Sequence, residues 1–159
     1  PQEVFLFSDT VAANIAFGAG DKVMTEVSEV AKAAHIDREI RGLKDGYETI
    51  VGERGIMLSG GQKQRVSIAR ALAKQHQVLI LDDSISAVDN TTEQHILANL
   101  QANLKEQTVI IITHRIFKNW DFDQIIVMDD GRIIERGTHE ELIAAKGYYA
   151  EIYEYQVMQ

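Results

Sequence analysis

The sequence contains no cysteine, and its only proline is Pro1. The absence of cysteine excludes a disulfide framework and a zinc–thiolate site, and it fits a reducing compartment. Long hydrophobic runs are missing too, because the longest apolar stretches, such as 109–112 (VIII), are far too short to cross a bilayer. No Pro/Ser-rich linker, low-complexity tract or repeat divides the chain. Its 159 residues, 45% of them hydrophobic, are expected to form one domain with a hydrophobic core.

Positive charge is scarce as well, since 16 Lys and Arg face 24 Asp and Glu and leave a formal net charge of −8. A protein that binds the phosphate backbone of DNA or RNA needs a basic face, so we expect no nucleic-acid partner. A single nucleotide stays possible, because a few backbone N–H groups at a helix start can hold a phosphate. The chain begins without an initiator Met or a signal peptide, and we therefore expect that it was cut from a longer protein.

Hydrophobic periodicity predicts a series of helices separated by short irregular segments. The expected helices span residues 21–35, 37–43, 60–75, 92–104 and 138–145, with a further helix from Tyr148. Thr138 and Glu141 form the sequence signature of a capping box at the start of one of them. The segment 42–57 is punctuated by glycine and is expected to be irregular.

Two continuous apolar runs, 77–81 and Thr108–Ile112, are rich in β-branched residues. Such runs are typical of strands buried on both faces of a parallel sheet, and the helix expected between them completes a βαβ unit. Asp129-Asp130-Gly131 predicts a hairpin between strands at 125–128 and 133–135. The pattern therefore indicates an α/β fold.

Polar residues stand at the carboxyl ends of both apolar runs, where ligands bind in open α/β sheets. Asp82 and Asp83 follow the first run, and Thr113 and His114 follow the second. Buried strands seldom end in paired acids unless a cation or a reacting group lies nearby. Taken alone, each feature is better explained by a turn cap or a hydrogen-bonded polar residue.

The segment 58–62 (LSGGQ) changes that balance. A serine at the expected cap position is followed by two glycines at the start of a helix. Glycine lets the backbone approach an anion closely, while the helix start offers free N–H groups and the positive end of the helix dipole. An ordinary capped loop would have the same local sequence, so the segment gains its meaning from its neighbours.

Three segments follow one another: LSGGQKQRVSIARAL from Leu58, VLILDDSISAVD from Val78 and IIITHR from Ile110. In this order and spacing they resemble the ATP-binding domain of ABC transporters, over essentially the whole chain. The resemblance implies part of a P-loop NTPase (RecA-like) core with a parallel sheet, together with the α-helical subdomain of that family. It assigns residues of about 3–76 to the helical subdomain and signature helix, and 77–159 to the remaining core and C-terminal helices. The segment 49–55 (TIVGERG) is similar to the loop by which exporters touch their membrane domains.

The resemblance implies roles for residues around a hydrolytic site. Gln2 looks like the Q-loop glutamine, which would contact Mg²⁺ and the attacking water. Asp82, at the end of a Walker B strand, would hold Mg²⁺ through water. Asp83 stands where the family places the residue that polarises the water, and His114 resembles the switch histidine that contacts the γ-phosphate. ATP and Mg²⁺ are the implied cofactors.

The resemblance also implies partners. The segment 58–62 matches the signature motif, and 86–89 (SAVD) looks like the D-loop. In the family's head-to-tail dimer, Ser59, Gly60, Gly61 and Gln62 would bind ATP held by a second ATP-binding domain. Coupling helices of transmembrane domains would be the other contact, which places the complete protein at the cytoplasmic face of the cell membrane.

Asp83 departs from the family pattern, which usually has Glu at that position. Aspartate withdraws the carboxylate by about one C–C bond, roughly 1.5 Å, and a displacement near 1 Å costs on the order of a hundredfold in rate. We therefore expect a slow or inactive site on this chain. An intact signature beside a weakened site is similar to one subunit of a heterodimeric multidrug or lipid exporter.

A second departure is the absence of G-x-x-x-x-G-K-[S/T] from the chain. The phosphate-binding loop and the antiparallel β subdomain of the family are therefore expected to be missing, and the 159 residues alone should not hydrolyse ATP. Apolar surface of the sheet should be left uncovered, which favours oligomerisation or marginal stability.

Three alternatives belong to other classes of ABC-type protein. The C-terminal ATPase lobe of SMC-like chromosome proteins also carries a signature, a Walker B strand and a switch histidine, but no heptad pattern leads into this chain. A soluble ABC protein such as a translation factor and an ABC importer ATPase are the other two. The exporter-like segment 49–55 argues against all three, together with Gln2 and its neighbours in the case of the SMC-like lobe and with segment 7–15 in the case of the importer.

Overall fold

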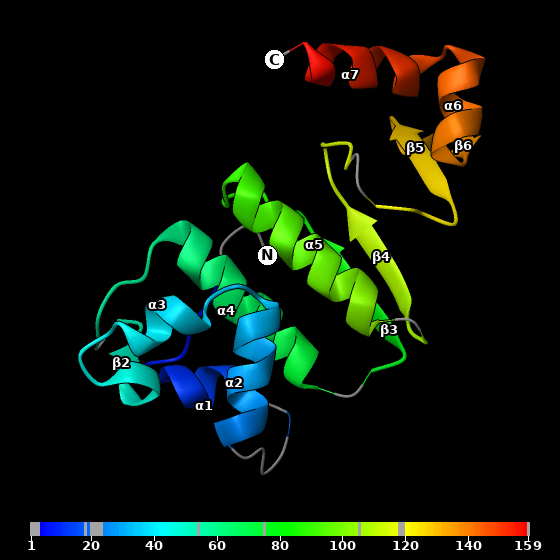
Figure 1. The fold of residues 1–159 in the computed structure, drawn as a ribbon. Helices are drawn as coiled ribbons and strands as arrows, with labels where there is room; N and C mark the ends of the chain where they lie inside the picture. Colours follow the sequence, from blue (N-terminus) through cyan, green and yellow to red (C-terminus); the bar gives the residue numbers. More distant parts are fainter. Residues whose placement is uncertain are drawn as a thin grey trace. The chain divides into compact units, whose positions relative to one another are not determined.

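A computed structural model describes residues 4–17, 19, 24–53, 55–74, 76–104, 106–117 and 120–158 (Figure 1). The chain divides into two compact units, Pro1–Ile112 and Thr113–Gln159, and each unit is described by itself. The sequence predicted a different kind of boundary, near Gln77, between the helical subdomain and the remaining core of the ATP-binding domain. That division stays a prediction. Within the described ranges, no helix is long and apolar enough to cross a membrane.

The first unit combines a group of helices with one βαβ unit. Its elements in chain order are β1 (Asp9–Thr10), α1 (Val11–Ala16), α2 (Met24–Ala33), α3 (Asp37–Arg41), a 3₁₀ turn η1 (Gly46–Glu48), β2 (Ile50–Val51), α4 (Gly60–Ala73), β3 (Val78–Asp82), α5 (Asn90–Asn103) and β4 (Thr108–Ile112). The α2, α3, α4 and α5 helices were all expected from the sequence, with ends that shift by a few residues. The short elements α1, η1, β1 and β2 were not.

The helical core forms where α1 and α2 both contact α4. Ile15 of α1, Ala31 of α2 and Val66 and Ala69 of α4 are all fully buried. On α4 these positions recur every three or four residues, which is the spacing that brings side chains onto one face of a helix. Burial of these side chains holds α4 against α1 and α2.

Asn14 fixes the N-terminal segment to α4, although it is a polar side chain with no exposed surface. Its amide pairs with both backbone groups of Phe7, accepting from the N–H at 2.9 Å and donating to the carbonyl at 3.0 Å. Arg70 of α4 donates to the Asn14 side-chain oxygen at 2.8 Å and to its backbone carbonyl at 2.7 Å. A buried amide is stable only when its hydrogen bonds are made, so this network pins α1 in place.

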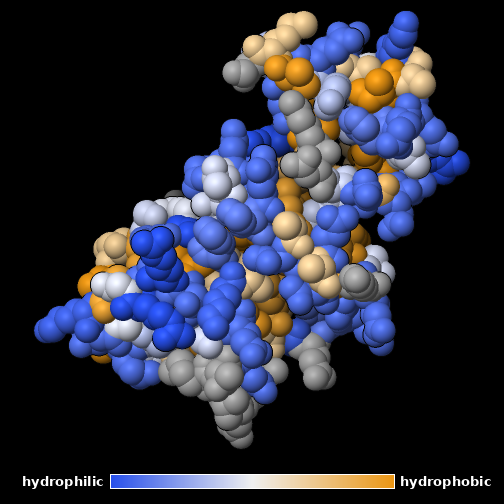
Figure 2. Space-filling view, viewed as in Figure 1, coloured by the Kyte–Doolittle hydropathy of each residue, from blue (hydrophilic) through white to orange (hydrophobic). Residues whose placement is uncertain are grey.

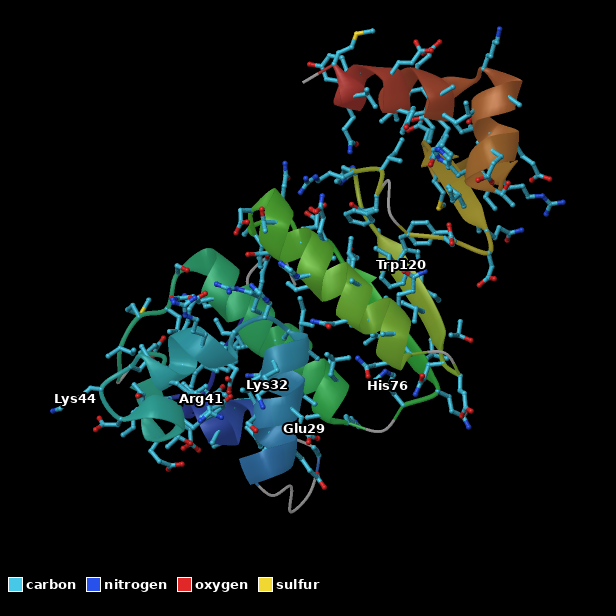
Figure 3. All side chains as sticks on the ribbon, viewed as in Figure 1. Glu29, Lys32, Arg41, Lys44, His76 and Trp120 are labelled. Atoms are coloured by element: carbon cyan, nitrogen blue, oxygen red, sulfur yellow. The ribbon has the colours of Figure 1, made fainter. Side chains whose placement is uncertain are left out.

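A second polar network ties α3 to the loop that precedes β2. The Tyr47 hydroxyl donates to Asp37 at 2.6 Å, and Arg41 donates to the same carboxylate at 2.9 Å. Figure 3 labels Arg41 on α3 and Lys32 on α2, the two cations that act on Asp37. Burial disfavours its charged form, but these hydrogen bonds outweigh burial and hold the pKa of Asp37 below its usual value.

The strands β3 and β4 pair in parallel, with Val78 opposite Thr108 and Asp82 opposite Ile112. Their burial corrects the sequence-based prediction of strands buried on both faces. Leu79 and Leu81 are buried, whereas Ile80 of β3 is 58% exposed. Side chains alternate between the faces of a strand, so one face of β3 is buried and the other is apolar and open. The open face agrees with the expected uncovered surface, while oligomerisation stays a prediction.

The second unit is a β-hairpin followed by two helices: β5 (Ile125–Asp129), β6 (Arg132–Gly137), α6 (His139–Ala145) and α7 (Tyr148–Val157). The hairpin and both helices were expected. A bulge between Val127 and Met128 interrupts the antiparallel register. Several apolar side chains stay exposed in this unit, Met128 at 62% among them, and Figure 2 shows such orange side chains between blue polar ones in both units.

Candidate functional site

The first turn of α4 is built by a capping box. The Ser59 hydroxyl accepts a hydrogen bond from the Gln62 N–H at 3.2 Å, and the Ser59 N–H donates to the Gln62 side-chain oxygen at 2.9 Å. Ser59 is therefore the N-cap, as expected from the sequence. Among the hydrogen bonds of the described residues, none uses the N–H of Gly60 or Gly61. These two groups point along the helix axis beyond its start, where the helix dipole is positive.

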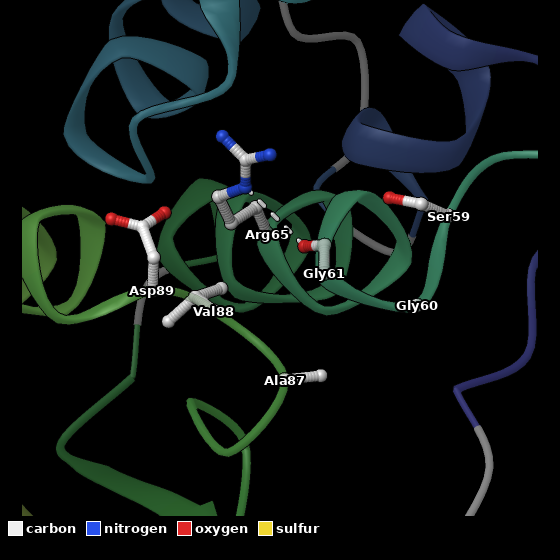
Figure 4. Close-up of a pocket in the computed structure, with 7 residues that line it drawn as sticks. All are labelled: Ser59, Gly60, Gly61, Arg65, Ala87, Val88 and Asp89. Carbon is white, nitrogen blue, oxygen red and sulfur yellow. Dashed lines mark hydrogen bonds between the residues drawn. The ribbon is translucent and has the colours of Figure 1, made fainter.

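A cavity of about 400 Å³ opens beside this turn (Figure 4). One wall is formed by α4 and the other by the segment between β3 and α5. The lining residues are Ser59, Gly60, Gly61, Arg65, Ala87, Val88 and Asp89. The structure thus brings the signature segment and the D-loop segment (86–89) together, although they are 24 residues or more apart in the chain. Gln62 does not line the cavity, because its amide is used by Ser59 and by Glu39.

The two walls approach each other so closely that Gly61 has no room for a side chain. A Cβ atom at Gly61 would meet the Ala87 carbonyl oxygen at 2.7 Å. A Cβ atom at Gly60 would meet only the Ala87 methyl group, at 4.0 Å, which is an ordinary contact. Of the two glycines, Gly61 is the one that the spacing of the walls requires.

Arg65 and Glu39 support the site, and sequence reasoning identified neither. Arg65 donates to the Glu39 carboxylate at 2.6 Å and to the His35 carbonyl at 2.7 Å, while Gln62 donates to Glu39 at 2.8 Å. Burial opposes the charge on Glu39, but the bonds from Arg65 and Gln62 outweigh it and hold the pKa of Glu39 below its usual value. Arg65 lies one turn after Gly61, which was the available signal, since residues four apart share a face of a helix.

The paired acids lie where the sequence placed them, at the carboxyl end of β3. Asp82 is the last residue of the strand, and its side chain is exposed. Asp83 has a positive φ of 46°, which is uncommon for a residue with a side chain. Its N–H donates to the Ile112 carbonyl at 2.9 Å, and its carbonyl accepts from the Ser86 hydroxyl at 2.9 Å. The backbone of Asp83 is therefore tied on both sides.

Asp89 closes the D-loop segment and caps α5. Its carboxylate accepts from the Thr92 N–H at 3.0 Å and from the Thr92 hydroxyl at 2.7 Å. These two bonds hold the pKa of Asp89 below its usual value. Because the cap is Asp89, α5 begins at Asn90, two residues before the start predicted from the sequence.

Gln2 and His114 are the two remaining predicted residues. Gln2 is not among the residues that the structure describes. His114 belongs to the second unit, where its side chain is exposed. The backbone two residues later is anchored to α7, because the Gln156 amide accepts from the Ile116 N–H at 2.9 Å and donates to its carbonyl at 2.8 Å.

Comparison with known families decides what kind of domain carries this cavity. The model of the family described as "ABC transporter" matches residues 1–86, which include the signature segment, β3 and the paired acids. The chain belongs to the ABC transporter family. This agrees with the resemblance drawn from the three sequence motifs.

Individual ABC transporters match almost the whole chain. The "Probable multidrug resistance ABC transporter ATP-binding/permease protein YheI" of Bacillus subtilis is 51% identical over 156 residues, which are 98% of this chain and 27% of that protein. An "ATP-dependent lipid A-core flippase" of Legionella pneumophila is 46% identical over 155 residues, 98% of this chain and 26% of that protein. The chain therefore spans about a quarter of the length of these relatives.

A solved ABC structure has the same fold as this chain. It is described as the "Structure of a bacterial Atm1-family ABC exporter with ATP bound", and it matches with a TM-score of 0.89 and 45% identity. The match covers 98% of this chain and 27% of that one. The fold is thus that of part of an ABC exporter, in agreement with the predicted α/β class.

Proposed function

We propose that the chain forms part of the ATP-binding domain of an ABC exporter, and that the start of α4 binds the γ-phosphate of ATP held by a second ATP-binding domain. The cavity beside Ser59, Gly60 and Gly61 is the observation that supports this most directly. Two N–H groups without acceptors and a serine hydroxyl with a proton to donate suit a phosphate oxygen. No acidic residue stands in the first turn of α4 to repel it.

ATP, when bound, supplies the phosphoryl group that water attacks, and Mg²⁺ would neutralise the negative charge of the phosphates. The proposed role of Asp82 is to hold Mg²⁺ through water, since an exposed carboxylate at a strand end is an oxygen ligand of the kind Mg²⁺ prefers. Gln2 and His114 would orient the attacking water, and Asp83 would polarise it. Ser59, Gly60 and Gly61 would act in trans, with Gln62 completing the capping box behind them.

The matched proteins favour an exporter over the importer and SMC-like alternatives, because their names describe multidrug resistance, lipid A-core flipping and an Atm1-family exporter. On this proposal the complete protein joins transmembrane domains and works at the cytoplasmic face of the membrane. Drugs or lipids are the proposed cargo class.

The site on this chain is proposed to be slow because of Asp83. A shorter side chain could be compensated only by a shift of the backbone toward the water. That shift is opposed by the bonds from Asp83 to Ile112 and from Ser86 to Asp83, which would have to break. A weakened site beside an intact signature favours a heterodimer, in which this subunit mainly serves its partner's ATP.

The test is Asp83→Glu in the assembled transporter, with the catalytic glutamate of the partner subunit removed so that only this chain's site can turn over. We expect ATP hydrolysis to rise by about tenfold or more, because the carboxylate regains the missing bond length. Asp82→Glu in the same background is the matched control, and it should not raise the rate. Unchanged turnover with Asp83→Glu would show that the site is not weakened by this residue.

A second measurement concerns the 159 residues by themselves. They contain no G-x-x-x-x-G-K-[S/T], so we expect no ATP hydrolysis above background from them. A clear ATPase rate that disappears with Asp82→Ala would contradict the proposed division of labour between chains.

A further inference from the structure

Gln64 joins the signature helix to the turn that follows β3. Its side-chain oxygen accepts a hydrogen bond from the Ala87 N–H at 2.9 Å. Its side-chain nitrogen donates to the Ser86 hydroxyl at 3.2 Å and lies 3.5 Å from the Asp83 carbonyl. Both polar atoms of the Gln64 amide thus contact the same turn, at Asp83, Ser86 and Ala87.

Gly61 approaches that turn from the same face of α4, since residues three apart are neighbours on a helix. The Ala87 carbonyl faces Gly61 at a distance that leaves no room for a Cβ atom, while the Ala87 N–H is held by Gln64. Ala87 is therefore held through its N–H by Gln64, while its carbonyl lies against Gly61. The spacing between the two walls of the cavity is set at this residue.

We propose that Gln64 is a positioning residue that holds the D-loop segment (86–89) against α4. The start of α4, which is proposed to bind phosphate, and the turn that carries Asp83 then move together. The inference rests on the proposed function and deepens it. Gln64 itself does not line the cavity, so it acts through Ala87 and Ser86. The start of α4 contacts the ATP of the second domain, whereas Asp83 acts on the ATP at this chain's own site. The Gln64 amide therefore connects the two ATP sites of a dimer through a single chain.

The turn needs such a lock because its own geometry is strained. Asp83 has a positive φ of 46°, in the left-handed region that strains a residue with a side chain. Within the turn, the Ser86 hydroxyl donates to the Asp83 carbonyl, and the Gln64 amide adds a tether from outside. Without the outside tether, the turn is free to relax and to carry Ala87 away from Gly61.

The experiment compares Gln64→Met and Gln64→Glu in the full transporter. Methionine keeps the length of the side chain and loses all three contacts, whereas glutamate keeps the acceptor for Ala87. A neutral hydrogen bond contributes about a factor of five to an equilibrium. We expect Gln64→Met to lower kcat for ATP roughly fivefold, with KM changed less than twofold, and Gln64→Glu to retain at least half of the wild-type kcat.

Two further readouts separate positioning from general stability. Hydrogen exchange of the Ala87 amide should be about fivefold faster in Gln64→Met, whereas Gln94→Met, an exposed glutamine of α5, should change neither exchange nor kcat. If Gln64→Met proves unstable, Ser86→Ala removes from the opposite side the hydroxyl that accepts from Gln64 and donates to the Asp83 carbonyl. Ser86→Ala combined with Gln64→Met should then cost less than the sum of the two single effects.

Faster Ala87 exchange with an unchanged kcat would overturn the coupling while leaving the proposed function intact. Unchanged Ala87 exchange in Gln64→Met, or additive effects of Gln64→Met and Ser86→Ala, would overturn the lock itself. A wild-type transporter without ATPase activity would instead refute the proposed function, so the two failures are distinguishable.

Discussion

Two helices of this chain begin with the same capping device, but their first turns carry different residues. In α4, Ser59 and Gln62 exchange hydrogen bonds, and in α6, Thr138 and Glu141 do the same. The first turn of α4 continues with two glycines and contains no acid. The first turn of α6 contains two acids, Glu140 and Glu141.

On the proposed function, a well-formed cap does not by itself make an anion site. At α6, the protein's own carboxylates occupy the positive end of the helix, and the pKa of Glu140 is held down by its own backbone N–H and by Thr138. At α4, the corresponding N–H groups of Gly60 and Gly61 are left without an internal acceptor. The D-loop segment forms the second wall of the cavity that these glycines line.

The largest expected effect breaks the close approach of these walls. Gly61→Ala introduces a Cβ atom into the space taken by the Ala87 carbonyl, so the D-loop segment must shift. A shift near 1 Å costs on the order of a hundredfold in rate, and we expect ATP hydrolysis by the transporter to fall at least tenfold. Gly60→Ala is the matched control, with an expected loss below about threefold because its Cβ atom has room. Equal losses in both variants would show that wall spacing is not what Gly61 provides.

An intermediate effect separates the two capping boxes. Ser59→Ala and Thr138→Ala each remove one N-cap hydrogen bond, which costs about 1 kcal/mol of stability. Thermal unfolding of the transporter's ATP-binding domain should therefore shift to a similar extent in both variants. Only Ser59→Ala should also lower the affinity for ATP in the assembled dimer, as measured by KM. A matching KM change in Thr138→Ala would contradict the assignment of the site to α4.

The smallest expected effect concerns acid. The folded-state pKa of Glu39 lies below its ordinary value of 4.5, so its stabilisation is present above that pH and is lost as the pH falls through the folded value. Glu39→Gln should therefore flatten the loss of stability below about pH 4.5, by less than about 1 kcal/mol because the pair is partly exposed. The pH dependence of stability is measured by thermal unfolding of the transporter between pH 3.5 and pH 7. This is roughly the range over which a carboxyl group titrates. An equally steep loss of stability below about pH 4.5 in Glu39→Gln would contradict this contribution of the Glu39 carboxylate.

Local signals in the sequence were sufficient for the long elements. The start of α4 followed from Ser59 and two glycines, and the parallel strands followed from runs of β-branched residues. The short elements α1, η1 and the β1–β2 pair were missed, because a segment of a few residues without a periodic pattern of its own depends on tertiary contacts for its stability. The buried Asn14, which joins Phe7 to Arg70, is an example of such a contact.

The site was predicted in part for the same reason. Ser59, Gly60 and Gly61 were identified because adjacent residues carry their chemistry. Glu39 and Gln64 were not, since their bonds to Arg65 and Ala87 span 26 and 23 positions of the chain. No pattern of nearby residues reveals such a bond.

By itself, the sequence determined where α4 and α6 begin, that the first turn of α4 lacks acids and which strand ends in paired aspartates. These properties depend on residues within a few positions of one another. Only the tertiary structure decided that Ala87 faces Gly61, that the backbone of Asp83 is tied on both sides and that β3 is buried on one face alone. Each of these depends on which distant segment packs against the element, and that is set by burial and hydrogen bonding in the folded chain.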